Sequence, residues 1–435
     1  MSKPVRPDSK LRRIRPLTRP IRVFHDGRAV EAEAGEPLAI SLIGAGRLLL
    51  ARSPKLHRPR GPYCLRAACD GCLARVDGEP NTMTCQVRAR DGMKVETQNV
   101  LGSRGADLLR ATDFIFPHGF DHHRLMAGTP ILGSAMQQIA RRVAGLGRMP
   151  ESERGISKES RTLTPDVLVV GAGRSGCRTA LALKKQRPHT EVLVVGSALE
   201  PGGRFALCEP EAWERLSSEL AALAVAPEMT STVAGLFLQP EQATRPTALV
   251  ARAGGAGEES RIDKVEPKVV VLAVGGHDYV ATFEGNDLPG VFSARAALTA
   301  LHYGVLVGRR VLLAGAGVEV DAFLRQAEAH ADVTQVSLTA LERAKGSSKV
   351  NGAVIRQGNT SQTLDVDAVV IGGPRAPSFE LAVQSGAEVD FDPGAGYVPR
   401  DRELAPTASG VPIFLARTTG STPEQLARRI TLILG

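Results

Sequence analysis

Short apolar runs separated by glycine-rich turns characterise the second half of the chain. Val167–Val170 is one such run. A glycine turn, a helix-like stretch at Arg178–Lys185 and a second run at Glu191–Val195 follow it. A strand without polar alternation is typical of a parallel sheet that is buried on both faces. The order strand, turn, helix, strand therefore predicts a βαβ unit and an α/β fold.

The same order recurs later in the chain. A strand at Arg310–Ala314 precedes a second glycine turn, and a helix at Asp321–Ala331 and a strand at Thr334–Leu338 come after it. Each unit places its glycine turn between a strand and a helix, which is the context of a dinucleotide site. Two dinucleotide-binding domains of the Rossmann type are therefore expected.

The first hundred residues show a different pattern. Ile21–Ala32 reads as two short β runs around Asp26-Gly27, a dipeptide that favours a tight hairpin turn, and residues 37–50 look helical. A small β-rich domain is expected here. The expected organisation is a basic flexible tail at 1–20, the β-rich domain at 21–100, a connector and linker at 101–163, a first, FAD-type dinucleotide-binding domain at 164–290 plus 385–435 closed by Val269–Val274, and an inserted second, NAD-type domain at 291–384 closed by Ala368–Ile371.

Composition limits the class of protein. The chain has 435 residues and 43% hydrophobic content, which is enough for several domains with cores. The longest apolar run, Ile40–Ala51, is too short and too interrupted to cross a membrane. Arg12-Arg13 is not followed by the apolar stretch of an export signal, so a cytoplasmic location, with peripheral membrane attachment as the alternative, is expected.

The net charge of +8 belongs mainly to one segment. Residues 1–22 hold eight basic residues against Asp8, giving +7 and leaving +1 for the rest of the chain. The basicity therefore predicts a solvated or partner-docked arm, and no sequence-specific nucleic-acid partner.

Four of the six cysteines follow a recognisable spacing. They read Cys64-x4-Cys69-x2-Cys72-x12-Cys85, and the first three have the spacing of plant-type ferredoxins. Ala67, Ala68 and Gly71 are small enough for backbone N–H groups to approach the sulfurs. A [2Fe-2S] cluster on these four thiolates is the prediction, with a four-cysteine zinc site as the alternative.

The other two cysteines carry no redox motif. Cys177 follows the first glycine turn, where a small apolar side chain packs a helix against a sheet, and neither it nor Cys208 belongs to a C-x-x-C pair. We expect the Cys177 thiol to be buried and inert, and neither cysteine supports a disulfide-reductase mechanism.

The first glycine turn is the stronger nucleotide candidate. Gly171-Ala-Gly173-Arg174-Ser175-Gly176 follows a strand and opens a helix, so that phosphates can lie at the helix N-terminus. Gly202, Gly203 and Arg204 form a further phosphate-side turn. The carboxylate that should hold the ribose hydroxyls at the end of the next strand is missing, and Ser197 is the residue available there. A packing role without nucleotide is the alternative.

The second turn, Gly315-Ala-Gly317-Val-Glu-Val320, lacks its third glycine. The end of its following strand, Ser337–Thr339, also lacks a carboxylate. A packing role is favoured for this turn.

Three segments resemble one known family. Ser53–Gly61, Ala144–Pro150 and Glu284–Val291 are similar to the α subunits of heteromeric sarcosine oxidases and their relatives, which include hydrogen cyanide synthase and dye-linked proline, opine and nopaline dehydrogenases. The resemblance runs from about residue 20 to the C-terminus. Relatives with a working flavin end on a strand and an Ala-Gly-Asp-like turn. The corresponding piece here is Phe414–Gly420, in which Arg417 could meet phosphate.

The resemblance implies a role in electron transfer. Such a subunit contributes a ferredoxin-like, β-grasp domain and a fold of two dinucleotide domains. It binds FAD, NAD or ATP at the first glycine turn. A flavoprotein β subunit, with a small subunit in some cases, oxidises the amine, and a quinone or carrier accepts the electrons. The sequence identifies no general base. A structural or assembly subunit with a cluster but no nucleotide, and a stand-alone NAD(P)H reductase, are the alternatives.

Overall fold

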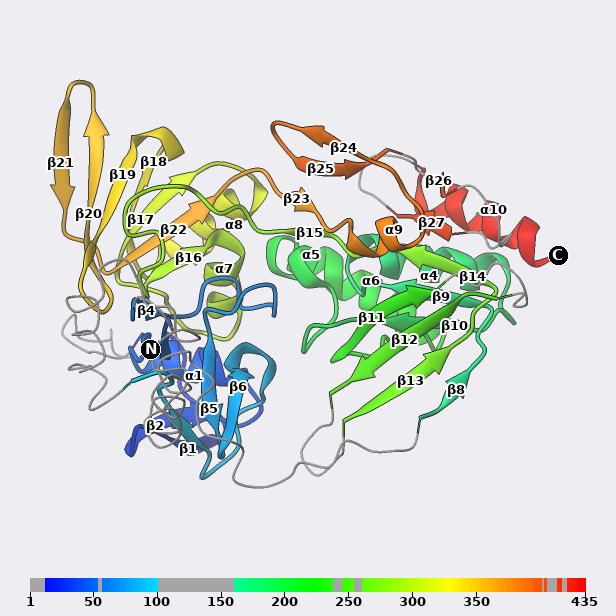
Figure 1. Ribbon diagram of the computed structural model, residues 1–435, viewed down its shortest axis with the longest axis horizontal. Coiled ribbons are helices and arrows are strands. Elements are labelled where there is room, and N and C mark those ends of the chain that lie inside the picture. Colours follow the sequence, from blue (N-terminus) through cyan, green and yellow to red (C-terminus); the bar gives the residue numbers. More distant parts are fainter. Residues whose placement is uncertain are drawn as a thin grey trace, which may run out of the picture. The chain divides into compact units, whose positions relative to one another are not determined.

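The computed structural model of the protein is an α/β chain in two compact units (Figure 1). Met1–Glu153 combines with Val280–Gly373 in one unit, and Arg154–Tyr279 combines with Pro374–Gly435 in the other. Each unit is therefore assembled from two separate stretches of sequence. The structure describes residues 12–53, 57–100, 160–237, 245–253, 260–400, 403–404, 413–416 and 421–435.

A five-stranded mixed sheet forms the N-terminal domain. Its first two strands make the predicted hairpin, in which Asp26 and Gly27 both have positive φ, 48° and 73°, the type I′ geometry. Helix α1 (Leu38–Gly44) is buried along its whole length and ends earlier than predicted, just before Gly46 turns to a φ of 67°. The strand order is β2-β1-β7-β5-β6, with β1 at Pro20–His25, β2 at Arg28–Glu33, β5 at Leu73–Val76, β6 at Glu79–Met83 and β7 at Lys94–Glu96, and the separate pair is β3 at Ala51–Arg52 with β4 at Pro59–Arg60.

The segment from Arg12 departs from the mobile tail that the sequence predicted. The Arg12 N–H donates to the Gly44 carbonyl at 3.0 Å, and the Arg12 carbonyl accepts from the Leu306 N–H at 2.8 Å. The Arg12 guanidinium is buried and donates to the carbonyl of Val307. Arg13 forms an ion pair with the buried Glu36. These contacts tie the N-terminal domain to the second dinucleotide domain within the same unit.

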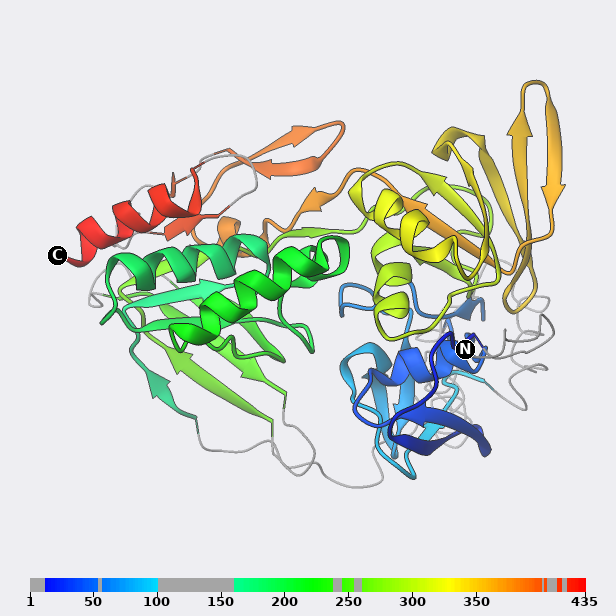
Figure 2. The same ribbon diagram turned by 180° about the vertical axis from the view of Figure 1, so that it is seen from behind.

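The second dinucleotide domain contains a four-stranded parallel sheet. Helices α7 and α8 lie on one side of this sheet (Figure 2). The predicted helix is displaced toward the N-terminus, because α8 starts directly after Gly317. The sheet order is β16-β22-β17-β18, and the elements are β16 at Val291–Ser293, α7 at Ala294–His302, β17 at Arg310–Gly315, α8 at Val318–Ala327, β18 at Asp332–Val336, β22 at Ala368–Gly372, and the antiparallel β19, β20 and β21 at Leu341–Gly346, Val350–Gln357 and Thr360–Leu364.

The other unit contains the first dinucleotide domain. Its strand β9 (Val167–Val170) is buried at all four positions, as the apolar run predicted. Val167 and Val169 face the helices, whereas Leu168 and Val170 face an antiparallel sheet. The main sheet has the order β10-β9-β14-β27-β26, with β10 at Val192–Val195, β14 at Val269–Leu272, β27 at Ile413–Leu415 and β26 at Glu403–Leu404.

Two different layers cover this sheet. Residues of α4, α6 and α10 pack on one face, and the four-stranded sheet β11-β12-β13-β8 packs on the other. A strand buried on both faces is therefore apolar throughout, which explains the pattern in the sequence. The covering elements are α4 at Arg174–Gln186, α6 at Pro210–Ala222, α10 at Pro423–Leu434, β8 at Thr162–Leu163, β11 at Ser231–Phe237, β12 at Thr247–Arg252 and β13 at Arg261–Val265, and α5 lies at Gly203–Cys208.

The two chain segments that connect the dinucleotide domains pair with each other as short strands. Strand β15 (Gly276–His277) is antiparallel to β23 (Ala376–Pro377). Ala382, on α9 (Glu380–Gln384), is buried in the core of the first domain. The inserted segment therefore ends before residue 374, earlier than the predicted residue 384. A hairpin of β24 (Val389–Asp392) and β25 (Gly396–Pro399) follows α9.

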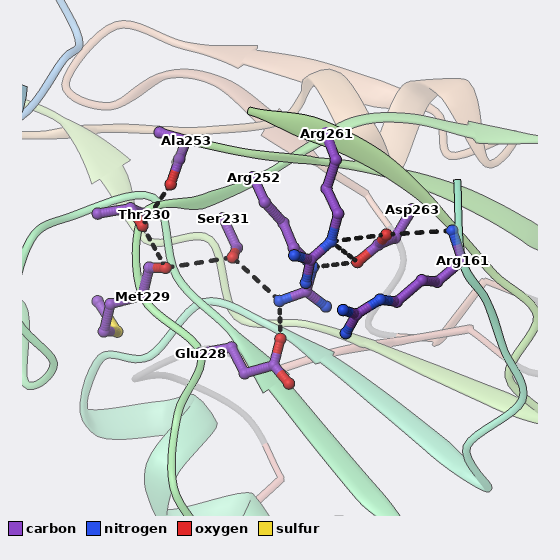
Figure 3. Close-up of polar contacts among 9 residues, drawn as sticks. All are labelled: Arg161, Glu228, Met229, Thr230, Ser231, Arg252, Ala253, Arg261 and Asp263. Atoms are coloured by element: carbon purple, nitrogen blue, oxygen red, sulfur yellow. Dashed lines mark hydrogen bonds and ion pairs between the residues drawn. The ribbon is translucent and has the colours of Figure 1, made fainter. Parts of the chain in front are cut away.

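A network of charges crosses the antiparallel sheet of the first domain (Figure 3). Asp263 is fully buried, and its carboxylate accepts hydrogen bonds from Arg252 and, at 3.1 Å, from Arg261. Arg252 also pairs with Glu228. Burial alone would raise the pKa of Asp263, but the hydrogen bonds from Arg252 and Arg261 outweigh it and hold this pKa below its ordinary value.

Replacing Asp263 tests this network. We expect Asp263→Asn to lower the free energy of unfolding by about 3–5 kcal/mol at neutral pH, because it leaves two arginines without their buried carboxylate. The depressed folded-state pKa stabilises the protein above the unfolded pKa of about 4, and this contribution is lost as the pH falls toward the folded value. Denaturant titrations between pH 7 and 3 should therefore show a smaller loss of stability in the variant. An equal pH dependence in both proteins would contradict this assignment. Asp166→Asn, at an ion pair with Lys268 on the surface, is the control.

Candidate functional site

The four predicted cluster cysteines lie together as two pairs. The thiols of Cys64 and Cys69 form a hydrogen bond with each other, and so do those of Cys72 and Cys85. The hydrogen bond with Cys64 lowers the pKa of Cys69 to about 6, and the bond with Cys72 lowers the pKa of Cys85. One thiol in each pair is therefore ready to ionise, as metal ligation requires.

Backbone N–H groups of the loop point at these sulfurs. The N–H groups of Ala68, Gly71 and Ala67 donate to Cys64, Cys69 and Cys85, respectively. Leu65 and Ala67 have positive φ, 51° and 58°, a conformation that is uncommon for residues with a side chain. The strained loop therefore turns several donors inward, where they stabilise thiolates and tune a bound cluster.

This donor set fits a two-iron cluster. Each iron of such a cluster takes two cysteine thiolates, and the loop provides two separate pairs. In the part of the chain that the structure describes, no group of three His, Cys, Asp or Glu side chains is arranged around a single metal ion. Cys64 and Cys69 would hold one iron, and Cys72 and Cys85 the other. Gln86, which the sequence did not single out, places its Nε2 3.9 Å from the Cys85 sulfur.

The cluster loop is fixed to the second dinucleotide domain. The Tyr63 carbonyl accepts from the Ser293 N–H at 3.0 Å, and Arg60 contacts Asp287 at 3.2 Å. A Cβ on Gly61 would lie 2.8 Å from the Cβ of Pro289. Described residues of two of the three family-like segments, Ser53–Gly61 and Glu284–Val291, are thus in direct contact. Pro54–Leu56 and Ala144–Pro150 lie outside the described residues.

The first glycine turn has the geometry of a phosphate site. Gly171 has a φ of 114°, and a Cβ there would lie 2.2 Å from the Ala273 carbonyl oxygen. A Cβ on Gly176 would lie 1.9 Å from the Gly171 oxygen, so this glycine permits the helix to pack on the strand. A Cβ on Gly173 would meet nothing within 4 Å, which leaves its backbone open to a ligand. The three glycines thus allow the tight turn, the approach of a phosphate to the backbone and the close packing of helix on strand, which are the roles of the glycines in a dinucleotide-binding turn.

The second phosphate-side turn lies beside the first. The Gly202 N–H donates to the Ala172 carbonyl at 2.8 Å, and Gly202 and Gly203 both have positive φ, 89° and 52°. Arg174, the first residue of α4, pairs with Glu209 at 3.5 Å and lies over the Phe205 ring. The first turn of α4 contains no acidic residue. Gly203 and Arg204 start α5, so the predicted residues are brought to one end of the sheet.

The ribose end of this site differs from the usual pattern. Strand β10 ends at Val195, and Gly196 and Ser197 follow without a carboxylate. Ser197 is exposed. The residues present therefore fit a diphosphate but not the usual recognition of ribose hydroxyls. Arg417 lies outside the described residues, so its predicted phosphate contact stays a prediction.

The second turn fits packing better than phosphate binding. A Cβ on Gly315 would lie 1.9 Å from the Gly372 oxygen, and a Cβ on Gly372 would lie 2.0 Å from Val320. Val320 thus replaces the third glycine by packing against a glycine on the neighbouring strand. Glu319 and Asp321 lie in the first turn of α8, where their charges oppose a diphosphate.

The two remaining cysteines belong to the first dinucleotide domain. Cys177 is buried, burial raises its pKa to about 12, and its thiol donates to the Ala172 carbonyl. Such a thiol is inert, as predicted. Cys208 is partly buried at the end of α5.

Comparisons with known proteins agree with this geometry. Residues 18–100 match the family described as "2Fe-2S iron-sulfur cluster binding domain". Over 87 residues the chain is 37% identical to hydrogen cyanide synthase subunit HcnA of Pseudomonas aeruginosa, which covers 20% of this chain and 83% of that protein. The N-terminal domain is therefore a [2Fe-2S] domain, as the cysteine spacing predicted.

Longer matches cover both units. The chain is 27% identical over 411 residues to sarcosine oxidase subunit alpha of Rhizobium meliloti, which covers 85% of this chain but only 41% of that protein. The crystal structure of L-proline dehydrogenase from P. horikoshii superimposes with a TM-score of 0.67 at 19% identity, covering 95% of this chain and 72% of that one. The latter match shows the flavoprotein-type fold.

The predicted resemblance is thus confirmed. In the part of the chain that the structure describes, no helix is long and apolar enough to cross a membrane. With its [2Fe-2S] domain and two dinucleotide folds, the chain is similar to sarcosine oxidase α subunits over most of its length and to hydrogen cyanide synthase subunit HcnA over 87 residues.

Proposed function

We propose that this chain is the electron-transfer subunit of a heteromeric flavin-dependent amine or amino-acid dehydrogenase or oxidase. The observation that carries the proposal is the arrangement of Cys64, Cys69, Cys72 and Cys85 as two thiol pairs within a [2Fe-2S] domain. When bound, a one-electron cluster beside a two-electron flavin divides hydride equivalents into single electrons, which suits a quinone or carrier acceptor.

The chain's own residues hold and tune the redox groups. The backbone donors at Ala67, Ala68 and Gly71 stabilise the cluster thiolates. The turns at Gly173 and Gly202 would bind the diphosphate of a nucleotide, with FAD as the first candidate and NAD or ATP as others. The contact of Tyr63 with Ser293 keeps the cluster loop in register with the second dinucleotide domain.

Substrate oxidation is assigned to a partner chain. The matched relatives are named as subunits of sarcosine oxidase and hydrogen cyanide synthase, and the chain spans 41% of the length of the sarcosine oxidase subunit. A flavoprotein β subunit, and in addition a small subunit, are the partners that this organisation suggests. A cytoplasmic location, with peripheral membrane attachment as the alternative, stays a prediction.

A second candidate function is that of a structural or assembly subunit with a cluster but no nucleotide. The absence of a carboxylate at Gly196 and Ser197 favours it, because ribose recognition normally depends on that group. The phosphate end of the site favours the first candidate.

The two functions differ in their redox response. Anaerobic addition of sarcosine, proline or an opine to the purified complex should bleach the visible absorption of the cluster within the turnover time. A complex whose cluster absorption stays unchanged with every amine and amino acid offered, while dithionite bleaches it, would overturn the electron-transfer role.

The cluster ligands can be tested one pair at a time. We expect Cys69→Ser and Cys85→Ser each to lose most of the iron and the visible absorption, because each leaves one iron with a missing thiolate. Iron analysis and electron paramagnetic resonance of the reduced protein are the measurements. Cys208→Ser should keep both signals. Retention of a complete cluster in Cys85→Ser would contradict the assignment.

Substitutions at two glycines distinguish a role in nucleotide binding from a role in folding. Gly173→Val should lower nucleotide affinity by about tenfold or more, because its side chain would occupy the open space at the turn. Gly176→Ala should instead lower stability by about 1–3 kcal/mol, because its Cβ would overlap the Gly171 carbonyl.

Calorimetric titration and thermal unfolding of both variants check this prediction. Unchanged nucleotide affinity in a folded Gly173→Val protein would show that the nucleotide does not bind at this turn.

A further inference from the structure

The carboxyl end of strand β10 is the place where a dinucleotide fold keeps its ribose-binding acid. That acid lies about 20 residues beyond the third glycine of the turn. In this chain the residues there are Gly196, which directly follows β10, and Ser197. The following inference rests on the proposed nucleotide site and concerns what occupies this position instead.

A segment from a later part of the chain runs alongside the end of β10. The Glu228 N–H donates to the Val194 carbonyl at 2.8 Å, and the Gly196 N–H donates to the Glu228 carbonyl at 2.9 Å. The Ser231 N–H then donates to the Gly196 carbonyl at 2.9 Å. Residues 228–231 therefore extend the edge of the sheet at its nucleotide end.

The side chain of Met229 fills the space beside Gly196. A Cβ built on Gly196 would lie 2.8 Å from the Met229 Cε and 3.0 Å from its Sδ. The same Cβ would lie 3.0 Å from the Cβ of Ala172, which is inside the first glycine turn. The side chain of an acidic residue at position 196 would overlap the space that the Met229 thioether occupies.

The pairing with β10 explains why Met229 points to this side. Val195 and Glu228 are in register, so their side chains share the face that packs on the antiparallel sheet. Met229, the next residue, points to the opposite face and packs against the helix-side core with Val194 and Ala172. Glu228 thus reaches Arg252 while Met229 reaches the glycine turn.

The backbone around Met229 is held in an unusual conformation. Thr230 has a φ of 55°, which is strongly disfavoured for a β-branched residue. The Thr230 and Ser231 hydroxyls donate to the Met229 carbonyl at 2.7 and 3.2 Å. Arg252 donates to the Ser231 hydroxyl and pairs with Glu228, and Asp263 anchors Arg252 (Figure 3). Strain that is maintained by so many contacts is a pointer to function.

We propose that Met229 replaces the ribose-binding carboxylate of the first nucleotide site. A thioether is a weak hydrogen-bond acceptor and cannot hold a pair of hydroxyls as a carboxylate does. The site therefore binds a nucleotide through its diphosphate and leaves the ribose 2′- and 3′-hydroxyls unrecognised. The network in Figure 3 keeps Met229 in place and so determines this specificity.

The test compares two ligands that differ only in these hydroxyls. Adenosine diphosphate (ADP) and 2′,3′-dideoxy-ADP are titrated calorimetrically into the full-length, cluster-containing protein, after bound nucleotide has been removed by dialysis against concentrated bromide. The wild-type protein should bind both within about threefold. The double variant Gly196→Glu/Met229→Ala restores the acid and clears its space, and it should prefer ADP by about tenfold or more. Gly196→Gln/Met229→Ala is the uncharged control and should show a smaller preference.

The outcomes separate this inference from the proposed function. Equal binding of the two ligands by the wild type, together with a preference for ADP in the glutamate variant, supports the inference. A wild-type preference for ADP of tenfold or more overturns it while leaving the nucleotide site intact. If neither protein binds ADP although both unfold at the wild-type temperature and keep their cluster absorption, the nucleotide site itself is refuted and the inference falls with it.

Discussion

Close backbone packing at two glycines determines where the cluster thiols lie. A Cβ on Gly71 would lie 2.3 Å from the Gly61 carbonyl oxygen, and a Cβ on Gly61 would lie 2.5 Å from the Leu48 oxygen and 2.8 Å from Pro289. The cysteine loop, the segment before it and the second dinucleotide domain therefore approach one another more closely than side chains would allow. A metal-binding loop needs such support, because its ligands must be held in position before the metal binds.

The first nucleotide site has the usual glycine pattern at its phosphate end and an altered ribose end. Its phosphate end has three glycines in their expected roles and a helix whose first turn contains no acid. Its ribose end lacks the carboxylate, and Met229 occupies the space beside Gly196. The two ends of a dinucleotide site act on different parts of the ligand, so one can change while the other is kept. The second glycine turn differs at the phosphate end as well, because Glu319 and Asp321 lie in the first turn of α8, where their charges oppose a phosphate.

Local patterns predicted the parts of the molecule that depend on neighbouring residues. The cysteine spacing, the Asp26-Gly27 hairpin and the buried strand at Val167–Val170 all express contacts within a short stretch of chain, and each is found in the structure. The docking of Arg12 on Gly304–Val307, the contact of Gly61 with Pro289 and the position of Met229 could not be predicted in this way. These features depend on contacts between residues that are far apart in the sequence. Local periodicity and motif spacing carry no information about such contacts. The predicted domain boundary at residue 384 failed for the same reason, because Ala382 is buried in a core formed mostly by earlier residues.

The central claim is that this chain carries one two-iron cluster and binds a nucleotide in its first dinucleotide domain. The most direct test is to measure iron, acid-labile sulfide, zinc and released nucleotide in the same sample of anaerobically purified protein. The account predicts two irons, two sulfides and one adenine nucleotide per chain, with FAD as the first candidate. One zinc without sulfide would contradict the cluster, and two irons without any nucleotide would leave the dinucleotide folds a purely structural role.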